Sequence, residues 1–199
     1  MRRRSLLAGL AGLAGCGLVP EESEPIEASA SAPATLPDDA AAAAGYARAV
    51  AETVTVETTV DTDLAGDVEL SASRDVVATL FRRVYRADAG RRFGLVTAPT
   101  VRIVENSETR YDPVPALDPS RVVELATDRS VATVADWTES GRGTLLGTET
   151  SRETATADDD ELALVRARAR AGDDAVTAMA LAPTADGTVA PLADVAYDG

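Results

Sequence analysis

Cys16, the only cysteine of the chain, is the residue whose position most clearly indicates a chemistry. It follows Leu13-Ala14-Gly15, and small side chains at these positions suit cleavage by a signal peptidase directly before the cysteine. The thiol of Cys16 supplies the side-chain nucleophile that can be alkylated to a thioether lipid. We therefore predict that residues 1–15 are a removable signal peptide and that Cys16 is the site of lipidation.

The residues before this cysteine have the composition of an export signal. Arg2, Arg3 and Arg4 form a basic start, and the apolar run from Leu6 to Leu13 is too short to span a bilayer, which needs about 20 helical residues. Arg3 and Arg4 are followed by one free position and two leucines, as in twin-arginine export signals. The alternative is a general basic start, which any export route uses. We predict a lipid-anchored protein on the external face of the cell membrane.

A second group of reactive side chains is arginine. Arg166, Arg168 and Arg170 alternate with alanines, so on a strand all three would line one face. Arginine binds carboxylates and phosphates through two parallel hydrogen bonds, which makes these residues candidates for anion binding. The alternative is ordinary ion pairing with acidic side chains of neighbouring strands. Trp137, the only tryptophan, would either form a ligand platform or fill the core.

The residue types that are missing exclude much conventional catalysis. The chain has no histidine and no lysine, and the single cysteine is assigned to lipid. Ser-His-Asp and Cys-His catalysis, His or Cys zinc sites and Schiff-base chemistry are therefore excluded. Asp61 and Asp63 resemble the start of a calcium loop, but Ala65 and Ala72 stand at two ligand positions. We predict no catalytic residues, no metal and no cofactor.

The charge of the chain limits its partners. Removal of residues 1–15 takes away three arginines, which leaves 16 basic and 33 acidic residues and a net charge of −17. Nucleic acid and anionic lipid head groups are poor partners for such a domain, because phosphate binding needs a basic face. The charge suits concentrated salt, where the Debye length falls to about 3 Å at 1 M. GC-rich codon usage is an alternative explanation of the composition.

The composition divides the chain into three parts. Residues 1–15 are the signal, and residues 16–34 are rich in Glu, Ser, Ala and Pro, which predicts a disordered acidic tether after the lipidated cysteine. Residues 35–199 predict one globular domain without a disulfide, whose core is packed mainly from Val, Leu and Ala.

Periodicity and turn residues predict an α+β fold, mainly an antiparallel sheet built from hairpins with two or three short flanking helices. The expected helices are 38–44 and one that opens at Asp118-Pro119 and ends near Thr127. The expected strands are 50–60 and 68–85 as a long hairpin, then 93–98, 101–104, 144–156 after a turn at 141–143, and 176–181.

The segment from Asp158 to Ala171 satisfies two rules. Acidic residues at its start, arginines towards its end and Gly172 after it are typical of a helix. Strict alternation of Arg and Ala from 166 to 171 is typical of a strand. The residues alone leave this choice open, and the run from Asp158 to Glu161 is interpreted as a solvated acidic face.

The chain contains a set of short motifs: Arg3-Arg4, Cys16 after Leu-Ala-Gly, Gly45-Tyr46, Pro113-Val114, Leu146-Gly147-Thr148-Glu149-Thr150, Arg170-Ala171-Gly172-Asp173-Asp174, and Pro183. In this combination the chain resembles a group of haloarchaeal lipoproteins whose shared domain has no known function. The resemblance implies a haloarchaeal source and a strand hairpin around Gly172-Asp173-Asp174, and it supplies no catalytic residue.

The function expected from the sequence is that of a membrane-tethered extracytoplasmic lipoprotein. Its domain would be a non-catalytic module that binds an unidentified protein or small ligand, with the membrane contacted through the lipid on Cys16. Two alternatives are a cell-surface hydrolase that uses paired carboxylates or a divalent metal, and a structural surface protein.

Overall fold

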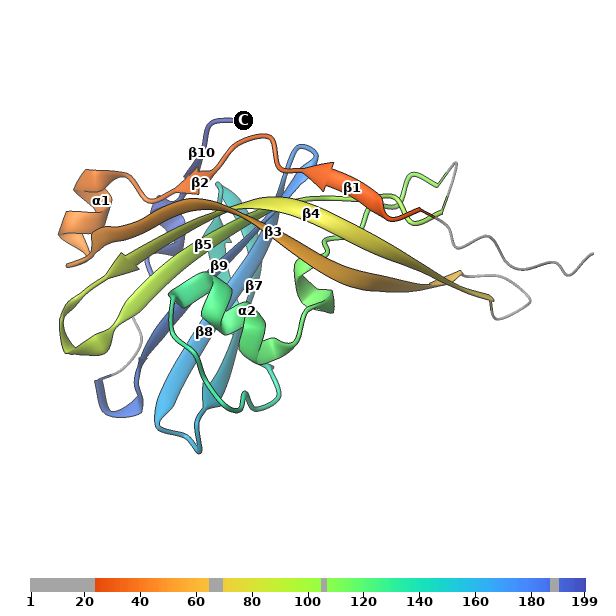
Figure 1. The fold of residues 1–199 in the computed structure, drawn as a ribbon. Coiled ribbons are helices and arrows are strands. Elements are labelled where there is room, and N and C mark those ends of the chain that lie inside the picture. The colour runs from red at the N-terminus through yellow and green to blue at the C-terminus, as the bar shows by residue number, and fades with distance from the viewer. Residues whose placement is uncertain (1–23, 65–69, 105–106, 187–189) are drawn as a thin grey trace, which may run out of the picture.

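Eight strands form one twisted, mostly antiparallel sheet in the computed structural model, which describes residues 24–64, 70–104, 107–186 and 190–199. The sheet has the order β1-β4-β5-β9-β8-β7-β6, and β3 pairs with the other edge of β4 (Figure 1). Its strands are β1 (Ile26–Ser29), β3 (Ala47–Leu64), β4 (Leu70–Arg86), β5 (Arg92–Pro99), β6 (Thr138–Leu145), β7 (Thr148–Ala157), β8 (Leu162–Ala171) and β9 (Asp174–Pro183).

Short elements flank this sheet. They are α1 (Asp38–Ala43), α2 (Pro119–Thr127), the 3₁₀ turns η1 (Asp88–Gly90), η2 (Val114–Ala116), η3 (Thr184–Asp186) and η4 (Leu192–Asp194), and a two-stranded ribbon of β2 (Ala34–Thr35) and β10 (Ala196–Tyr197). The predicted α+β class is confirmed, and so are both expected helices. Within the described ranges no helix is both long and apolar enough to cross a membrane.

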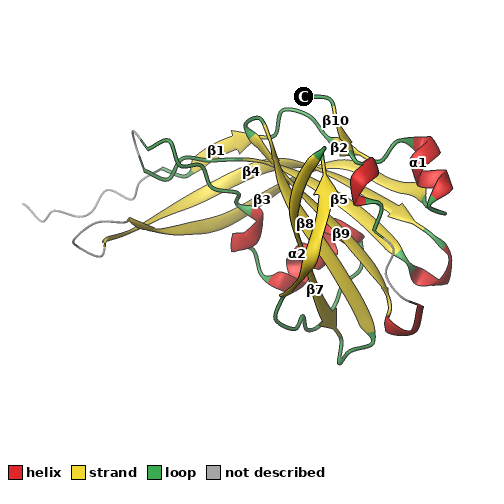
Figure 2. Ribbon diagram, turned by 180° about the vertical axis from the view of Figure 1, so that it is seen from behind, coloured by secondary structure: helices red, strands yellow, loops and turns green. Residues whose placement is uncertain are grey.

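Both faces of the sheet are covered, which explains why β9 at its centre is buried along almost its whole length. On one face lie α2 and the segment before it, packed on side chains such as Val96 and Met179. On the other face lie α1, β2 and η4, packed on Phe93 and Leu95. Figure 2 shows the molecule from behind, with β7 and β8 in front of α2. The core contains many Val, Leu and Ala side chains, as predicted.

The long hairpin of β3 and β4 confirms the expected pair of strands. β3 extends the predicted strand 50–60 at both ends, and β4 ends one residue after the predicted strand 68–85. The far edge of β4 is shared by β5 and by β1, which runs parallel to it with Ile26 opposite Val76. The prediction of a disordered tether as far as residue 34 is therefore wrong for β1. Ile26 and Ala28 alternate towards the core and pack against it, so even an acidic segment contributes apolar contacts.

A buried carboxylate ties the start of the domain to its end. Asp174, which is 1% exposed, accepts hydrogen bonds from the Ser31 amide (2.8 Å) and the Tyr197 hydroxyl (2.7 Å). Burial, followed by this bond to Asp174, raises the pKa of Tyr197 to about 12. Nearby, the hydroxyl of Tyr85 accepts from the Leu36 amide at 2.8 Å, which fixes the chain just after β2.

The helix α2 lies against β5 at a glycine. A Cβ atom on Gly94 would stand 1.5 Å from the carbonyl oxygen of Ala126, so only glycine allows the helix to approach the strand this closely. At its other end Asp118 caps the helix, and its carboxylate accepts from the Ser120 amide at 2.9 Å. The cap was expected from the sequence, whereas the contact at Gly94 was not.

Two local predictions are wrong. The expected turn at 141–143 lies inside β6, where Gly141 sits at a register shift, and the chain instead turns at Leu146 and Gly147 with φ values of 53° and 72°. Positive φ at both positions is typical of a type I′ hairpin turn, and leucine is an unusual choice for the first. The expected strand 101–104 is reduced to a single bridge between Val101 and Tyr111.

The ambiguous segment is a strand. β8 pairs with β7 on one edge and β9 on the other, and its hairpin with β9 turns at Gly172, as the resemblance implied. Pairing on both edges buries Leu162, Leu164 and Ala167. This burial stabilises the strand more than the acidic start and the arginines near the end would stabilise a helix. The acidic run makes the preceding turn, since Asp158, Asp159 and Asp160 all have positive φ, a conformation that Asp tolerates.

Candidate functional site

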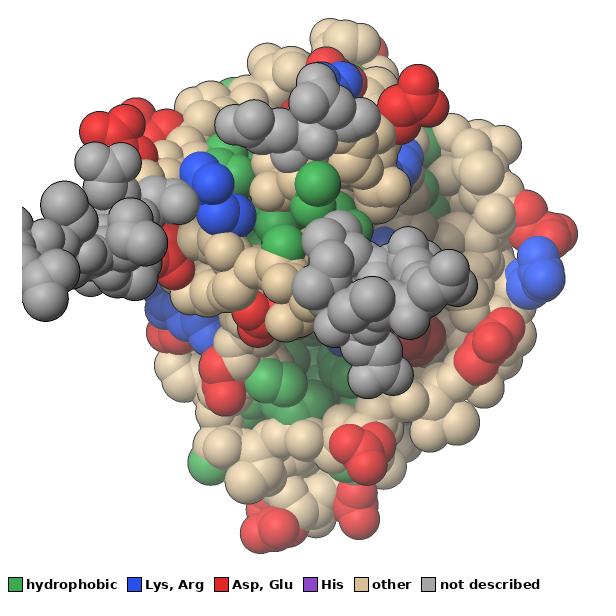
Figure 3. Space-filling model, turned by 90° about the vertical axis from the view of Figure 1, so that its right-hand side faces the viewer, with side chains coloured by type: hydrophobic (Ala, Val, Ile, Leu, Met, Phe, Trp, Pro, Cys, Tyr) green, Lys and Arg blue, Asp and Glu red, His purple; other side chains and the backbone are tan. Residues whose placement is uncertain are grey.

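A cavity of about 340 Å³ lies between the η2–α2 segment and the sheet strands β8 and β9. Most of its lining is apolar, with two arginines and one threonine: Val114, Pro115, Leu117, Pro119, Val122, Trp137, Arg166, Arg168 and Thr177. Figure 3 shows the side of the molecule to the right in Figure 1, where hydrophobic side chains gather in a hollow and charged side chains lie mostly around it.

The register of three neighbouring strands brings the charged side chains of the cavity together. Arg166 lies directly opposite Glu153 of β7, and the two form a bidentate pair with N–O distances of 2.8 and 3.1 Å. Arg168 donates to the same carboxylate at 3.1 Å. The carbon of the Arg166 guanidinium also lies 3.9 Å from the centre of the Trp137 ring, a cation–π contact.

The three arginines predicted to bind an anion differ in their position relative to the cavity. Arg166, Arg168 and Arg170 lie on one face of β8, and the first two line the cavity. Arg170 instead donates to the backbone carbonyl of Arg110 and does not line it. The interpretation of Arg166 and Arg168 as partners of a cross-strand acid agrees with Glu153, and the pairing leaves open their use by a ligand.

The cavity carries an excess of positive charge. Hydrogen bonding from Arg166 lowers the pKa of Glu153, so this carboxylate stays ionised at neutral pH. One negative charge is then shared by two guanidinium groups. Of the described residues that line the cavity, none is acidic. A chain with a net charge of −14 therefore places a locally cationic group beside an apolar cavity.

Thr177 adds a polar group without a partner. It lies on β9 directly opposite Arg168, is 2% exposed and lines the cavity. Its hydroxyl has no hydrogen-bond partner in the part of the chain that the structure describes. A buried polar group left unpaired costs about 1–3 kcal/mol. Such a group at a cavity wall is suited to a ligand that completes its hydrogen bond.

Asp112 holds the apolar wall opposite the sheet. Its carboxylate accepts from the Val114 amide at 2.9 Å, which fixes the start of η2. Burial raises the pKa of Asp112, and the nearby charges of Arg168 and Arg170 act in the opposite direction. The Asp-Pro sequence at 112–113 is a turn signal, whereas no sequence signal pointed to Glu153 or Thr177.

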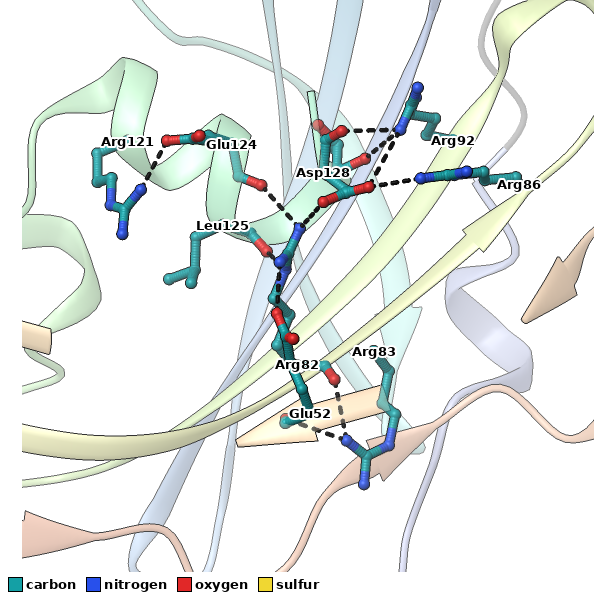
Figure 4. Close-up of polar contacts among 10 residues, drawn as sticks. Glu52, Arg82, Arg83, Arg86, Arg92, Arg121, Glu124, Leu125 and Asp128 are labelled. Carbon is teal, nitrogen blue, oxygen red and sulfur yellow. Dashed lines mark hydrogen bonds and ion pairs between the residues drawn. The ribbon is translucent and has the colours of Figure 1, made fainter. Parts of the chain in front are cut away.

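A second polar cluster holds the C-terminal end of α2 (Figure 4). Arg82 of β4 donates to the carbonyl oxygens of Glu124 and Leu125 and to the carboxylate of Asp128. The carboxylate of Asp128 also accepts from Arg86, and its carbonyl accepts from Arg92. These contacts satisfy carbonyl groups that every helix leaves unpaired at its C-terminus. The cluster therefore positions the helix that forms one wall of the cavity.

Other sequence-predicted residues lie elsewhere. Cys16, Arg3 and Arg4 lie outside the described residues, and so does the turn at 65–69 of the calcium-like sequence. The acidic turn before β8 serves the fold, because the carboxylate of Asp158 accepts from the Ala132 amide at 2.7 Å. In the described ranges, no group of three or more Cys, Asp or Glu side chains is placed to hold a metal.

Comparison with known proteins gives one match. A family model described as a domain of unknown function, DUF6517, matches residues 33–196, from the residue before β2 into β10. No curated protein and no solved structure matches the chain significantly.

Proposed function

Because the chain belongs to this DUF6517 family, whose domain has no known function, we propose a function from its own geometry: it is a non-catalytic module that binds a small ligand in the cavity between η2–α2 and β8–β9. In this proposal the module is a haloarchaeal lipoprotein, exported through a twin-arginine signal and held at the external face of the membrane by a lipid on Cys16.

The cavity is the observation that carries the proposal. Ligand sites are concave and mostly apolar, typically have volumes of about 300–1,000 Å³, and contain a few polar groups that orient the ligand. This cavity has a volume of about 340 Å³, apolar walls on the η2–α2 side and three polar side chains on the sheet side. It also contains a buried hydroxyl that lacks a partner among the described residues.

The residue types at the cavity favour binding over catalysis. A hydrolase of the alternative type would need two carboxylates facing one cleft. The carboxylate nearest the arginines, that of Glu153, is held by Arg166 and Arg168, and its lowered pKa makes it a weak base. Thr177 has no base hydrogen-bonded to it within the described ranges, so its hydroxyl is not activated as a nucleophile.

The position of β1 supports a short connection between membrane and domain. Residue 26, where β1 begins, follows Cys16 by about ten residues, which span at most roughly 35 Å when fully extended. The domain would therefore lie close to the membrane surface. The acidic composition of the whole chain favours folding in concentrated salt, in agreement with the proposed source.

The anchor is tested by Cys16→Ser in a haloarchaeal host. We expect the variant to move from the membrane fraction to the medium, because serine cannot form the thioether. Gly17→Ser is the matched control, since it changes the neighbouring residue and keeps the thiol. Membrane retention of Cys16→Ser, with normal amounts of protein, would show that the anchor lies elsewhere.

The binding function is tested through Trp137, which lines the cavity and is the only tryptophan. Its fluorescence would be titrated in molar salt with small apolar compounds that carry neutral, acidic or basic head groups. We expect a saturable change with at least one class of compound. Val122→Phe, which fills the apolar side, should abolish it. If no compound of any class gives a saturable change, the proposed function is wrong.

A further inference from the structure

We infer that the ligand of this cavity is a small apolar molecule with a single carboxylate, bound with its head group between Arg168 and Thr177. The inference rests on the proposed binding function and adds the chemical class of the ligand. It is argued from the charge balance, from the unpaired hydroxyl and from the placement of the apolar walls.

The charge balance indicates an anion with one negative charge. Arg166 and Arg168 share the single carboxylate of Glu153. Asp112 is a further acid near Arg168 and Arg170. Even with both acids ionised, these three arginines carry one positive charge more than the two acids balance. Of the two arginines that pair with Glu153, Arg166 is the more fully engaged, with both contacts to this carboxylate and its stacking on Trp137. Arg168 makes a single hydrogen bond to Glu153 within the described part of the chain, which leaves donors for a ligand.

The position of Thr177 indicates where the head group lies. Arg168 and Thr177 are directly paired across β8 and β9, and both line the cavity. A carboxylate offers two acceptor oxygens, so it can accept from the guanidinium and from the hydroxyl at once. The ligand would thereby provide the partner that the buried Thr177 hydroxyl lacks among the described residues.

The opposite walls indicate the rest of the molecule. Val114, Leu117 and Val122 form an apolar surface on the η2–α2 side, facing the sheet side that carries the arginines. A ligand that spans the cavity would therefore be polar at one end and apolar at the other. Arg166 is mostly buried, with 17% of its side chain exposed, so its field is screened less by salt than that of a surface charge.

The experiment compares four straight-chain ligands that each contain eight carbon atoms: octanoate, octanol, octylamine and octyl phosphate. The protein is the full chain carrying Cys16→Ser, purified in molar salt without detergent, and the readout is the fluorescence of Trp137. We expect octanoate to bind about tenfold more tightly than octanol, since a hydrogen bond to a charged group contributes roughly this factor. Octylamine and octyl phosphate should bind more weakly than octanoate.

Two variants locate the head group, and a third is their control. Arg168→Met should remove the preference for octanoate over octanol, and Thr177→Val, which has nearly the same shape without the hydroxyl, should reduce it. Neither substitution should weaken the binding of octanol. Arg142→Met is the matched control, because Arg142 pairs with Glu149 on exposed parts of β6 and β7. It should leave the affinity for all four ligands unchanged.

The outcomes separate this inference from the proposed function. If octanol or octylamine binds as tightly as octanoate, or if octyl phosphate binds more tightly, the carboxylate assignment is wrong although the cavity binds ligands. An octanoate preference that survives in Arg168→Met would also overturn it. If none of the four ligands changes the fluorescence, the proposed function itself fails.

Discussion

At the scale of single residues, Asp128 combines a backbone and an electrostatic role. It ends α2 in the left-handed conformation, with φ of 57°, and its carboxylate pairs with Arg82 and Arg86 at 2.8 and 2.5 Å. Hydrogen bonding from Arg82 lowers its pKa. Asparagine tolerates the same backbone conformation without the charge, whereas alanine adopts it only at a higher cost in free energy. The two substitutions therefore separate the two roles.

We expect Asp128→Asn to lower the free energy of unfolding by about 1 kcal/mol, a small value because a partly exposed ion pair is screened by solvent. Asp128→Ala should cost about 1–2 kcal/mol more, since it also places a Cβ-bearing residue with no local hydrogen bond in the left-handed region. Urea unfolding in molar salt measures both. Equal losses for the two variants would mean that the backbone role is absent.

The same lowered pKa predicts how stability depends on pH. Because the pKa of Asp128 lies lower in the folded than in the unfolded state, its contribution is present above the unfolded value of about 3.9. It is lost as the pH falls below that value, through the folded pKa. Asp128→Asn should therefore show a shallower loss of stability below about pH 4 than the unmodified chain, measured by urea unfolding at each pH.

Ionisation of Asp112 should have the opposite effect on stability from that of Asp128. Burial raises its pKa, so the ionised form of this carboxyl destabilises the fold relative to the protonated form. Asparagine keeps the oxygen that accepts from the Val114 amide and removes the charge. We expect Asp112→Asn to raise the free energy of unfolding at neutral pH, and the gain to shrink in acid, where the carboxyl of Asp112 is protonated. A loss at neutral pH would show that pairing with the nearby arginines outweighs burial.

At the scale of elements, the packing of α2 on β5 depends on one residue. Gly94 and Gly143 are both strand glycines, but a Cβ atom meets the Ala126 carbonyl oxygen at 1.5 Å in the first case and only Leu192 at 3.6 Å in the second. The two positions therefore form a matched pair for the same substitution.

We expect Gly94→Ala to destabilise the protein by about 1–3 kcal/mol or more, because the helix must shift away from the sheet. Gly143→Ala should change the free energy of unfolding little, or raise it slightly, since alanine loses less entropy in a strand than glycine. Thermal unfolding of both variants measures the difference. A Gly94→Ala protein as stable as the unmodified chain would mean that α2 packs differently.

Local patterns predicted most of the helices and strands but not the contacts between them. Alternation put Arg166 and Arg168 on one face if the segment was a strand, a choice that the residues alone left open. The Asp118-Pro119 cap predicted the start of α2. The partner Glu153 and the unpaired Thr177 come from flanking strands, and their positions depend on the register of β7, β8 and β9. Nothing in a single strand encodes that register, so the cavity could not be derived from the residues alone.

At the scale of the whole molecule, the acidic surface predicts a strong dependence on salt. The net charge of −14 repels itself when salt is low, and the Debye length falls from about 10 Å at 0.1 M to about 3 Å at 1 M. We expect the melting temperature to rise steeply over this range, by about 2–4 °C for each 1 kcal/mol of relieved repulsion. A melting temperature that stays flat or falls in calorimetry would contradict this.

The position of β1 has a mechanical consequence for an anchored protein. β1 precedes the matched family region and is held to β4 in a parallel register of four residue pairs. If the chain is anchored through Cys16 as proposed, a pull from the membrane side along the axis of β1 would load those pairs in shear, all at once, before any force reaches β2. Under a sudden force β1 would detach from β4 first. This would lengthen the connection between the membrane and the domain, while the rest of the domain stays folded.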